Sequence, residues 1–342
     1  MKAIVKQHEQ RGIAVQEVPE PEMGSRDARI RIRAAGICGT DLHIFRWDEW
    51  ARQRLRVPVT IGHEFVGTIE ELGSEVSHLR IGDRVSGEGH ITCGHCYYCR
   101  TGQGHICRDV EIIGVDRDGC FAEYLIMPSE NLWPVPQAMP DRHAAIFDPL
   151  GNAMHTVMST QVAERAVLIA GAGSIGLFAV AISRAVGASR IIVIEPNDLK
   201  RQKAVDMGAD SGYHPQDDRI ETRIRAETEE MGPEVFFELS GNPLALTMGL
   251  NLVRRGGTAA ILGIYEREVS IDWSNLVVLK GITIQGISGR QMYKTWYQCQ
   301  SFLASNGSAI DPVITHELPF YEAEDGFALM EAGMAVKVIL TF

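Results

Sequence analysis

A short strand, a glycine-rich turn and a helix follow one another between residues 166 and 186, and this succession constrains the fold most. Ala166–Ala170 is apolar throughout, as a buried strand is. The turn Gly171-Ala-Gly-Ser-Ile-Gly176 has the G-x-G-x-x-G pattern, and helical spacing runs from Leu177 to Val186. Arg190–Ile194 is then typical of a second strand. Strand, helix and strand in this order predict a βαβ unit, which requires a parallel sheet.

The glycine turn has the composition of a dinucleotide-binding loop. Gly171 permits the tight turn, Gly173 lets the backbone approach a pyrophosphate, and Gly176 lets the helix pack close to the strand. A helix N-terminus offers free N–H groups and a partial positive charge to the phosphates. Because the motif stands between a buried strand and a helix, where its mechanism needs it, we predict dinucleotide binding at this turn.

Glu195, directly after the second strand, indicates which dinucleotide binds. A carboxylate at this position accepts hydrogen bonds from the adenosine ribose hydroxyls and repels a 2′-phosphate, so we predict NAD rather than NADP. Lys200 and Arg201 follow closely, and their positive charges could neutralise such a phosphate. Lys200 is a further candidate for contact with the cofactor.

Three more apolar segments and a different kind of sequence before residue 150 indicate two domains. Val235–Leu239, Thr258–Leu262 and Ile282–Gly286 are predicted strands of the same parallel sheet. Residues 1–150 instead hold short alternating segments, such as Arg29–Arg33 and Val66–Glu70, separated by Gly, Pro and Asp turns. That pattern is typical of a β-rich domain.

The last part of the chain is expected to return to the first domain. Residues 292–305 and 321–331 have helical spacing, and residues 337–341 form a final predicted strand. The predicted fold class is therefore α/β. A β-rich domain is made of residues 1–150 and 291–342, and a dinucleotide-binding domain of residues 151–290 is inserted between them.

Four of the seven cysteines crowd into one short loop with the spacing C-x2-C-x2-C-x7-C. Four thiolates suit tetrahedral zinc, and a closed shell leaves no position open for chemistry, so this site is expected to be structural. A four-iron, four-sulfur cluster is an alternative, but such clusters usually have Pro after the last Cys, where this chain has Arg108. The crowding also favours a reducing compartment over a disulfide framework. The predicted ligands are Cys93, Cys96, Cys99 and Cys107.

Charge and hydropathy narrow the range of partners. The chain has 33 Lys and Arg against 44 Asp and Glu, a formal net charge of −11. An acidic surface repels the phosphates of nucleic acids and anionic lipids, so we expect neither nucleic acid nor a membrane as a partner. No apolar run approaches the ~20 residues that a membrane span needs, and the N-terminus breaks into charge too early for a signal peptide. We therefore expect a cytoplasmic protein.

A second set of candidate ligands, Cys38, His63 and Glu64, is scattered and proves little by its chemistry alone. However, Gly62-His63-Glu64-x-x-Gly67-x5-Gly73-x-x-Val76 matches the zinc motif of the medium-chain dehydrogenase/reductase superfamily, which the chain resembles from end to end. Longer strings resemble the L-threonine dehydrogenase branch of that superfamily. They are Cys38-Gly-Thr-Asp-Leu-His43, Trp47-Asp-Glu-Trp50, Ser86-Gly-Glu-Gly-His-Ile-Thr-Cys-Gly94 and Phe147-Asp-Pro-Leu-Gly-Asn152.

This resemblance implies a GroES-like catalytic domain, an inserted Rossmann domain and two zinc ions per chain. The catalytic zinc would be held by Cys38, His63 and Glu64, with one position open for a substrate hydroxyl. Asp148 stands where related enzymes carry Glu or Cys. Because Asp is one methylene shorter than Glu, we expect it beside the metal shell rather than in it. Which of Glu64 and Asp148 completes the shell stays open.

The same resemblance implies roles in handling the substrate and the cofactor. Thr40 and His43, three positions apart on a helical turn, would relay the hydroxyl proton to solvent. His90 would discriminate the amino acid substrate. A homotetramer is also implied, with Ile282–Gly286 as an edge strand at a subunit interface. Further cofactor contacts are expected in the glycine loop and at the carboxyl ends of later strands, at Ile175, Leu262, Gly263, Ile264, Gly286 and Ile287.

The implied activity is the NAD- and zinc-dependent oxidation of the 3-hydroxyl of L-threonine, a small-molecule substrate, to 2-amino-3-oxobutanoate. A polyol or 2,3-butanediol dehydrogenase with the same zinc and cofactor is the nearer alternative. The four-cysteine loop alone would also allow a non-catalytic zinc-ribbon module, for example one that binds nucleic acid. The acidic net charge and the intact second ligand set argue against that module.

Overall fold

A computed structural model describes all residues, 1–342, and divides the chain into two compact units. The first unit contains residues 1–149, 291–296 and 314–342, and the second contains residues 150–290 and 297–313. The division differs from the predicted domain boundaries in one segment. Residues 297–313 pack with the second unit, whereas the sequence led us to expect them in the first.

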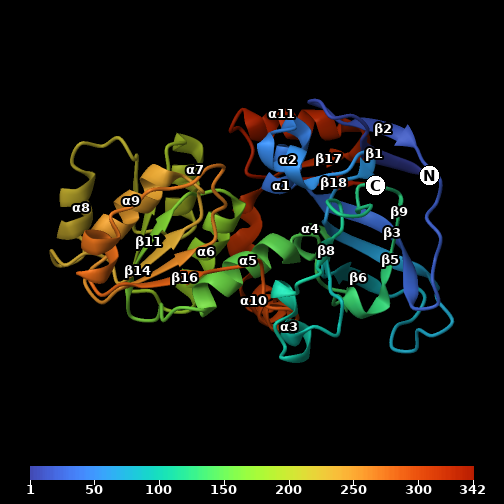
Figure 1. Ribbon diagram of the computed structural model, residues 1–342, viewed down its shortest axis with the longest axis horizontal. Coiled ribbons are helices and arrows are strands. Elements are labelled where there is room, and N and C mark those ends of the chain that lie inside the picture. Colours follow the sequence, from blue (N-terminus) through green and yellow to red (C-terminus); the bar gives the residue numbers. More distant parts are fainter. The chain divides into compact units, whose positions relative to one another are not determined.

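The second unit is built on a six-stranded parallel sheet (Figure 1, green through orange). Its order is β13-β12-β11-β14-β15-β16, so the strand sequence runs outward from β11 in both directions. This is the doubly wound arrangement, with its switch point between β11 and β14. The strands are β11 (Ala166–Ala170), β12 (Arg190–Ile194), β13 (Ser211–Tyr213), β14 (Val235–Glu238), β15 (Thr258–Ile261) and β16 (Thr283–Gly286).

Burial explains why these segments read as continuous apolar runs. Every residue of β11 and β14 is buried, as a parallel sheet covered by helices on both faces requires. β16 is the outer strand and is partly exposed. The predicted strands agree with the structure to within one residue at each end, and the parallel α/β fold is confirmed. The helices of this unit include α6 (Ser174–Ala185), α7 (Asp198–Asp206), α8 (Ile220–Ala226) and α9 (Pro243–Leu252).

The first unit is built mainly on a seven-stranded sheet of order β10-β6-β5-β3-β18-β17, with β9 also paired to β3. β18 lies beside β3, so the C-terminal strand completes a sheet begun near the N-terminus. A smaller sheet has the order β2-β1-β4. The strands are β1 (Lys2–Lys6), β2 (Ala14–Glu17), β3 (Asp27–Gly36), β4 (Val59–Thr60), β5 (Glu64–Leu72), β6 (Arg84–Gly87), β9 (Tyr124–Pro128), β10 (Leu132–Pro134), β17 (Ile314–Pro319) and β18 (Lys337–Thr341).

The alternation of Arg and Ile in β3 places one face in the core and the other toward solvent. Ile30 and Ile32 are buried, whereas Arg31 and Arg33 are exposed. The core of this unit also contains the fully buried rings of Phe121 and Phe327. The short helices of this unit are α1 (Gly39–Arg46), α2 (Glu49–Arg54), α3 (Tyr97–Arg100), α4 (Asp141–Ala144) and α11 (Ala323–Glu331).

The chain passes between the two units within two long helices. They are α5 (Phe147–Met158) and α10 (Lys294–Ile310). Neither these helices nor any other in the structure combines the length and apolar character that crossing a bilayer requires.

Candidate active site

Cys38, His63 and Glu64 come together in the first unit, with their ligand atoms within 4.8 Å of one another. Two neighbouring strands bring them there, because β3 and β5 pair with Gly36 opposite Glu64. Cys38 follows the end of β3, and His63 immediately precedes β5. Gly36 is needed at this approach, since a Cβ there would lie 2.2 Å from Glu64 Oε2.

Asp41 lies beside His63. Its carboxylate is fully buried, accepts a hydrogen bond from the Cys38 backbone N–H at 2.8 Å, and lies 3.8 Å from His63 Nδ1. Burial by itself would lower the pKa of His63, but the charges of Asp41 and Cys38 raise it to about 10. The same negative field favours any cation. A thiol, an imidazole and a carboxylate within one coordination sphere therefore fit zinc.

Lys337, the first residue of β18, is a partner of Glu64 that sequence reasoning missed. Its Nζ lies 2.9 Å from both Glu64 oxygens and donates to the Ile37 carbonyl at 2.8 Å. Both side chains are fully shielded from solvent. Burial alone would lower the pKa of Lys337, but the charges of Glu64 and Cys38 raise it, so the lysine stays protonated. The sequence signal for this contact was a lysine at the first position of a mainly apolar strand.

Thr40 and His43 both lie on α1, close to the first ligand. Thr40 Oγ1 is 3.9 Å from Cys38 Sγ. His43 Nδ1 pairs with Asp48, and 38% of the His43 side chain is exposed. The Trp47–Trp50 string contains two acids, Asp48 and Glu49, and a free carboxylate there could hold a substrate ammonium. Asp48 is instead engaged by His43 and by the Ala51 N–H, so it caps α2 and orients the imidazole.

His90 is held by a buried carboxylate. Glu88 is fully buried and accepts from the His90 backbone N–H at 3.0 Å, from His90 Nδ1 at 2.8 Å and from Trp296 Nε1 at 2.9 Å. Because a carboxylate only accepts, His90 carries a proton on Nδ1, which leaves Nε2 for another partner. Trp296 stacks on Phe147 with ring centroids 5.0 Å apart. Trp296 is a second residue that sequence reasoning missed.

Asp148 lies on the first turn of α5 and is buried. Its charge contributes to the pKa values of His63 and Glu64, so it lies near the ligand group. It is not among the residues whose ligand atoms converge within 4.8 Å. Glu64, rather than Asp148, is the carboxylate of that group.

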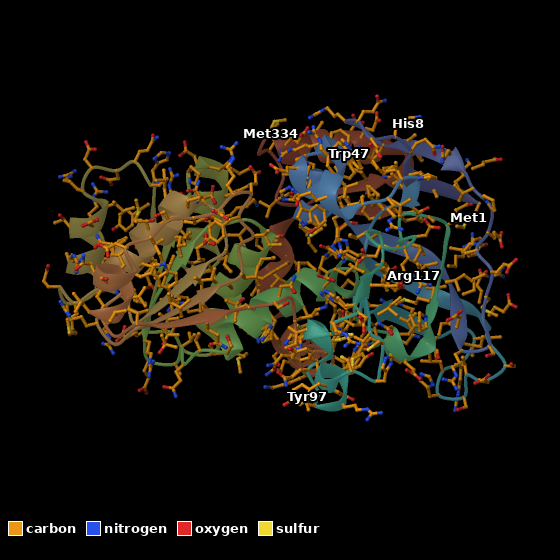
Figure 2. The ribbon with its side chains drawn as sticks, in the orientation of Figure 1. Met1, His8, Trp47, Tyr97, Arg117 and Met334 are labelled. Carbon is orange, nitrogen blue, oxygen red and sulfur yellow. The ribbon has the colours of Figure 1, made fainter.

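The four clustered cysteines form a second group, on the loop between β7 (His90–Ile91) and β8 (Glu111–Ile112). Their sulfur–sulfur distances include 3.5, 3.6, 3.9 and 4.0 Å. A tetrahedron of Zn–S bonds would place the sulfurs about 3.8 Å apart. Backbone N–H groups lower the pKa of Cys96 to about 6, whereas burial and the neighbouring thiols raise the pKa of Cys99 to about 11. Tyr97 stands at the exposed outer end of this lobe (Figure 2).

In the second unit, the glycine loop has the backbone that its sequence predicts. Gly171 has φ +95°, and Gly173 is the N-cap of α6. A Cβ on Gly176 would lie 2.0 Å from the Gly171 carbonyl oxygen, so no larger residue fits there. Ile175 lies within the first turn of α6.

Glu195 stands at the carboxyl end of β12, buried against the glycine loop. Its carboxylate accepts from Ala172 N at 2.7 Å and from Asn197 N at 2.9 Å, and spare lone pairs remain for ribose hydroxyls. Arg201 is engaged by the Glu195 carbonyl and by Asp198. That engagement reduces its capacity to neutralise a 2′-phosphate. The Lys200 backbone N–H donates to the Asn197 side chain, which caps α7.

The remaining cofactor candidates lie at the same edge of the sheet as the glycine loop. Leu262, Gly263 and Ile264 follow β15, Gly286 ends β16, and Ile287 comes next. Ile264 is 76% exposed, whereas Ile287 is buried. The carboxyl edge of a doubly wound sheet is where ligands bind.

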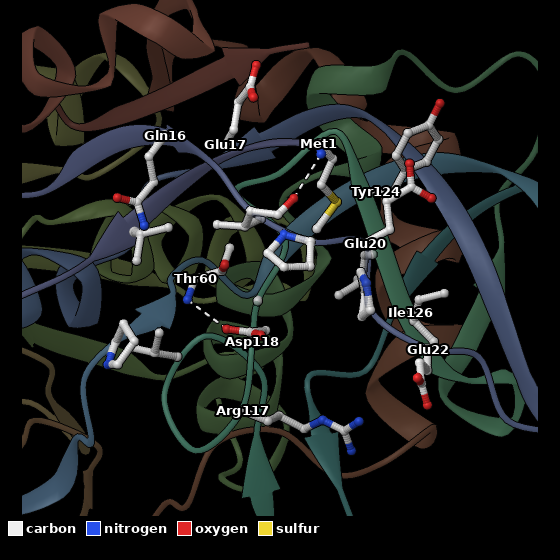
Figure 3. Close-up of a pocket in the computed structure, with 18 of the residues that line it drawn as sticks. Met1, Gln16, Glu17, Glu20, Glu22, Thr60, Arg117, Asp118, Tyr124 and Ile126 are labelled. Atoms are coloured by element: carbon white, nitrogen blue, oxygen red, sulfur yellow. Dashed lines mark hydrogen bonds between the residues drawn. The ribbon is translucent and has the colours of Figure 1, made fainter.

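A cavity of about 620 Å³ in the first unit lies among other residues (Figure 3). It is bordered by β1, β2 and the segment around Asp118, which accepts from the Thr60 N–H. None of the predicted site residues lines it. We therefore do not assign this cavity to the candidate active site.

Comparisons with known proteins agree with this geometry. Residues 24–137 match the alcohol dehydrogenase GroES-like domain, and residues 174–305 match the zinc-binding dehydrogenase domain. The chain is 45% identical to an L-threonine 3-dehydrogenase of Marinomonas sp. (strain MWYL1) over 99% of both chains. It is 44% identical to one from Bacillus subtilis (strain 168), covering 99% of this chain and 98% of the relative.

Solved structures share the fold over the whole chain. An alcohol dehydrogenase from Thermus sp. ATN1 superposes with a TM-score of 0.91 at 29% identity, covering 100% of this chain and 99% of the other. The 2R,3R-butanediol dehydrogenase from Bacillus subtilis superposes with a TM-score of 0.90 at 27% identity and the same coverage. The chain therefore belongs to the zinc-binding medium-chain alcohol dehydrogenase family, as its motifs predict, and is an enzyme of that type.

Proposed function

We propose that this enzyme oxidises the 3-hydroxyl of L-threonine to 2-amino-3-oxobutanoate with NAD as the acceptor. The convergence of Cys38, His63 and Glu64 beside the Thr40 hydroxyl supports the chemistry. The choice of substrate is supported by the relatives named L-threonine 3-dehydrogenase, at 42–45% identity over essentially the full chain. The product is a β-keto acid, which loses CO₂ readily unless another enzyme consumes it.

When bound, zinc supplies Lewis acidity toward a hydroxyl, and NAD is the hydride acceptor. Cys38 and His63 would hold the metal, and the Asp41 carboxylate lies 3.8 Å from His63 Nδ1. The Thr40 hydroxyl accepts the proton that the substrate hydroxyl loses and releases its own proton toward His43. His43, oriented by Asp48 and partly exposed, passes that proton to solvent.

In the zinc-bound enzyme, the Glu64 carboxylate would face two cations, Lys337 and the metal. Lys337 already contacts both of its oxygens, so a metal bound to Glu64 would compete with the lysine for the carboxylate charge. We assign Cys38 and His63 as constant ligands and Glu64 as an exchangeable one. With the four-cysteine lobe, this makes two zinc ions per chain.

Cys38→Ser tests the catalytic metal. The variant should lose one of the two zinc ions, keep its fold and lose threonine-dependent NADH formation by at least ~100-fold, since a lost ligand costs more than a lost outer partner. Metal analysis, circular dichroism and NADH absorbance measure these effects. Cys120→Ser is the matched control: this buried thiol contacts the Glu64 carbonyl but belongs to neither ligand group. Retention of both zinc ions by Cys38→Ser would rule out the assignment.

Glu195→Ser tests the preference for NAD. Removing the carboxylate removes both the ribose hydrogen bonds and the repulsion of a 2′-phosphate, so the ratio of kcat/KM for NAD over NADP should fall by roughly 10-fold or more. Glu195→Asp keeps the charge and is the control. Equal use of NADP by the wild type would show that Lys200 or Arg201 dominates instead.

We also propose that the enzyme is a cytoplasmic homotetramer. The outer strand β16 presents an unpaired edge, and Trp273, Val278 and Leu279, which precede it in the chain, are more than half exposed. An exposed strand edge next to apolar side chains suits pairing with a second copy. The clustered thiols and the acidic charge support a reducing, cytoplasmic location.

A polyol or 2,3-butanediol dehydrogenase is the second candidate, favoured by the fold shared with the butanediol enzyme. Both candidates use the same ligands and cofactor loop. They differ in what must surround the substrate, because a zwitterion needs charged partners and a diol does not.

A further inference from the structure

Glu238, the last residue of β14, is a buried carboxylate outside the machinery described so far. Its side chain accepts from Ser240 N at 2.9 Å, from the Ser240 hydroxyl, from Gly241 N at 3.1 Å and from the Tyr265 hydroxyl at 2.8 Å. Its own carbonyl accepts from Leu262 N and Gly263 N. The residue therefore joins the loops that follow β14 and β15.

All of these donors are neutral, and Glu238 forms no ion pair in the structure. Hydrogen bonds stabilise the negative charge but do not cancel it. A fully buried carboxylate is normally paired with a cation, so an unbalanced one at a ligand-binding edge indicates that the ligand brings the positive charge.

The position of Glu238 in the sheet indicates which part of a dinucleotide it faces. A doubly wound sheet has two mononucleotide-binding halves. The glycine loop after β11 and Glu195 after β12 serve the adenosine half, and β14, β15 and β16 form the other half. Ser240 packs on the glycine loop itself, since a Cβ on Gly171 would lie 3.0 Å from Ser240 Cβ. Glu238 thus lies in the half of the sheet that would receive the nicotinamide.

We propose that Glu238 sets the balance between the two redox forms of the cofactor by stabilising the positively charged nicotinamide ring of NAD relative to the neutral ring of NADH. The inference rests on the proposed use of NAD. It makes Glu238 a positioning and electrostatic residue rather than a catalytic one, because its carboxylate acts through the field in the site and through the loops that it joins.

The test is titration of the purified protein with NAD and, separately, with NADH, in which calorimetry measures each Kd. In Glu238→Gln the Kd for NAD should rise about five-fold or more relative to the Kd for NADH, because the amide has the same shape without the charge. Tyr265→Phe keeps the charge and loses one hydrogen bond, so its two Kd values should change by the same factor. Glu234→Gln removes a carboxylate just before β14, at the other end of the same strand. It should leave the ratio of the Kd for NAD to the Kd for NADH unchanged.

Two results would overturn the inference. One is an equal change, or no change, in both Kd values for Glu238→Gln. The other is a shift in the ratio for Tyr265→Phe as large as that for the glutamine variant, which would assign the effect to loop order. Glu238→Asn, also uncharged, carries the same test if the glutamine variant does not fold. A wild type that binds neither NAD nor NADH would instead contradict the proposed function, and this inference with it.

Discussion

Replacement of Cys93 by Ser should remove one zinc ion per chain and unfold the lobe between β7 and β8. The four sulfurs are spaced as one tetrahedral ion requires, and no disulfide replaces the metal. Binding of structural zinc amounts to about 10–16 kcal/mol in small zinc domains, and that binding energy is folding energy. The loss should appear as one zinc fewer by metal analysis, a lower Tm and rapid proteolysis after residue 92.

Cys299→Ser is the matched control for this lobe. Cys299 is a fully buried thiol on α10 that takes part in no ligand group, so the variant should keep both zinc ions. Wild-type protein with iron, or with a single zinc, would refute the assignment of the four cysteines. A Cys93→Ser protein that retained two zinc ions would do so as well.

Lys337→Met should destabilise the first unit by about 3–5 kcal/mol, because it leaves the Glu64 charge buried without its partner. Urea unfolding of the variant and the wild type measures the difference. Adding Glu64→Gln to Lys337→Met should recover most of the loss, since a pair of neutral side chains needs no compensation.

The bound metal offers a further check on this pair. Without Lys337, the metal is the remaining cation for Glu64, so the variant should depend more strongly on added zinc for its stability than the wild type does. Two results would show that the ion pair does not stabilise the fold. One is a destabilisation of less than about 1 kcal/mol for Lys337→Met, and the other is a double variant that is less stable than Lys337→Met alone.

The sequence predicted those parts of the molecule that local pattern determines. β11 and β12 begin and end where their apolar runs do, and the Gly171 turn has the positive φ that only glycine adopts readily. The four cysteines converge as their spacing in one loop requires. In each case the relevant contacts lie within a few residues of one another or follow from a periodic pattern.

What the sequence could not show depends on contacts between distant segments. Lys337 reaches Glu64 only because β18 returns beside β3, and Trp296 reaches Glu88 across a comparable separation. Asp48 seemed available to a substrate until the structure placed it against His43. Glu238 looked like one polar residue at the end of an apolar strand, and its loop contacts emerge only from the fold.

We conclude that this family member acts on L-threonine, and the ratio of kcat/KM for L-threonine over 2,3-butanediol measures that preference. His90, which Glu88 holds through Nδ1, keeps Nε2 for a charged group of a zwitterionic substrate. A diol brings no charged group to this nitrogen, so we predict a preference for threonine of at least about 100-fold, followed through NADH absorbance. Comparable efficiencies for the two alcohols would contradict the claim and favour a general secondary-alcohol dehydrogenase.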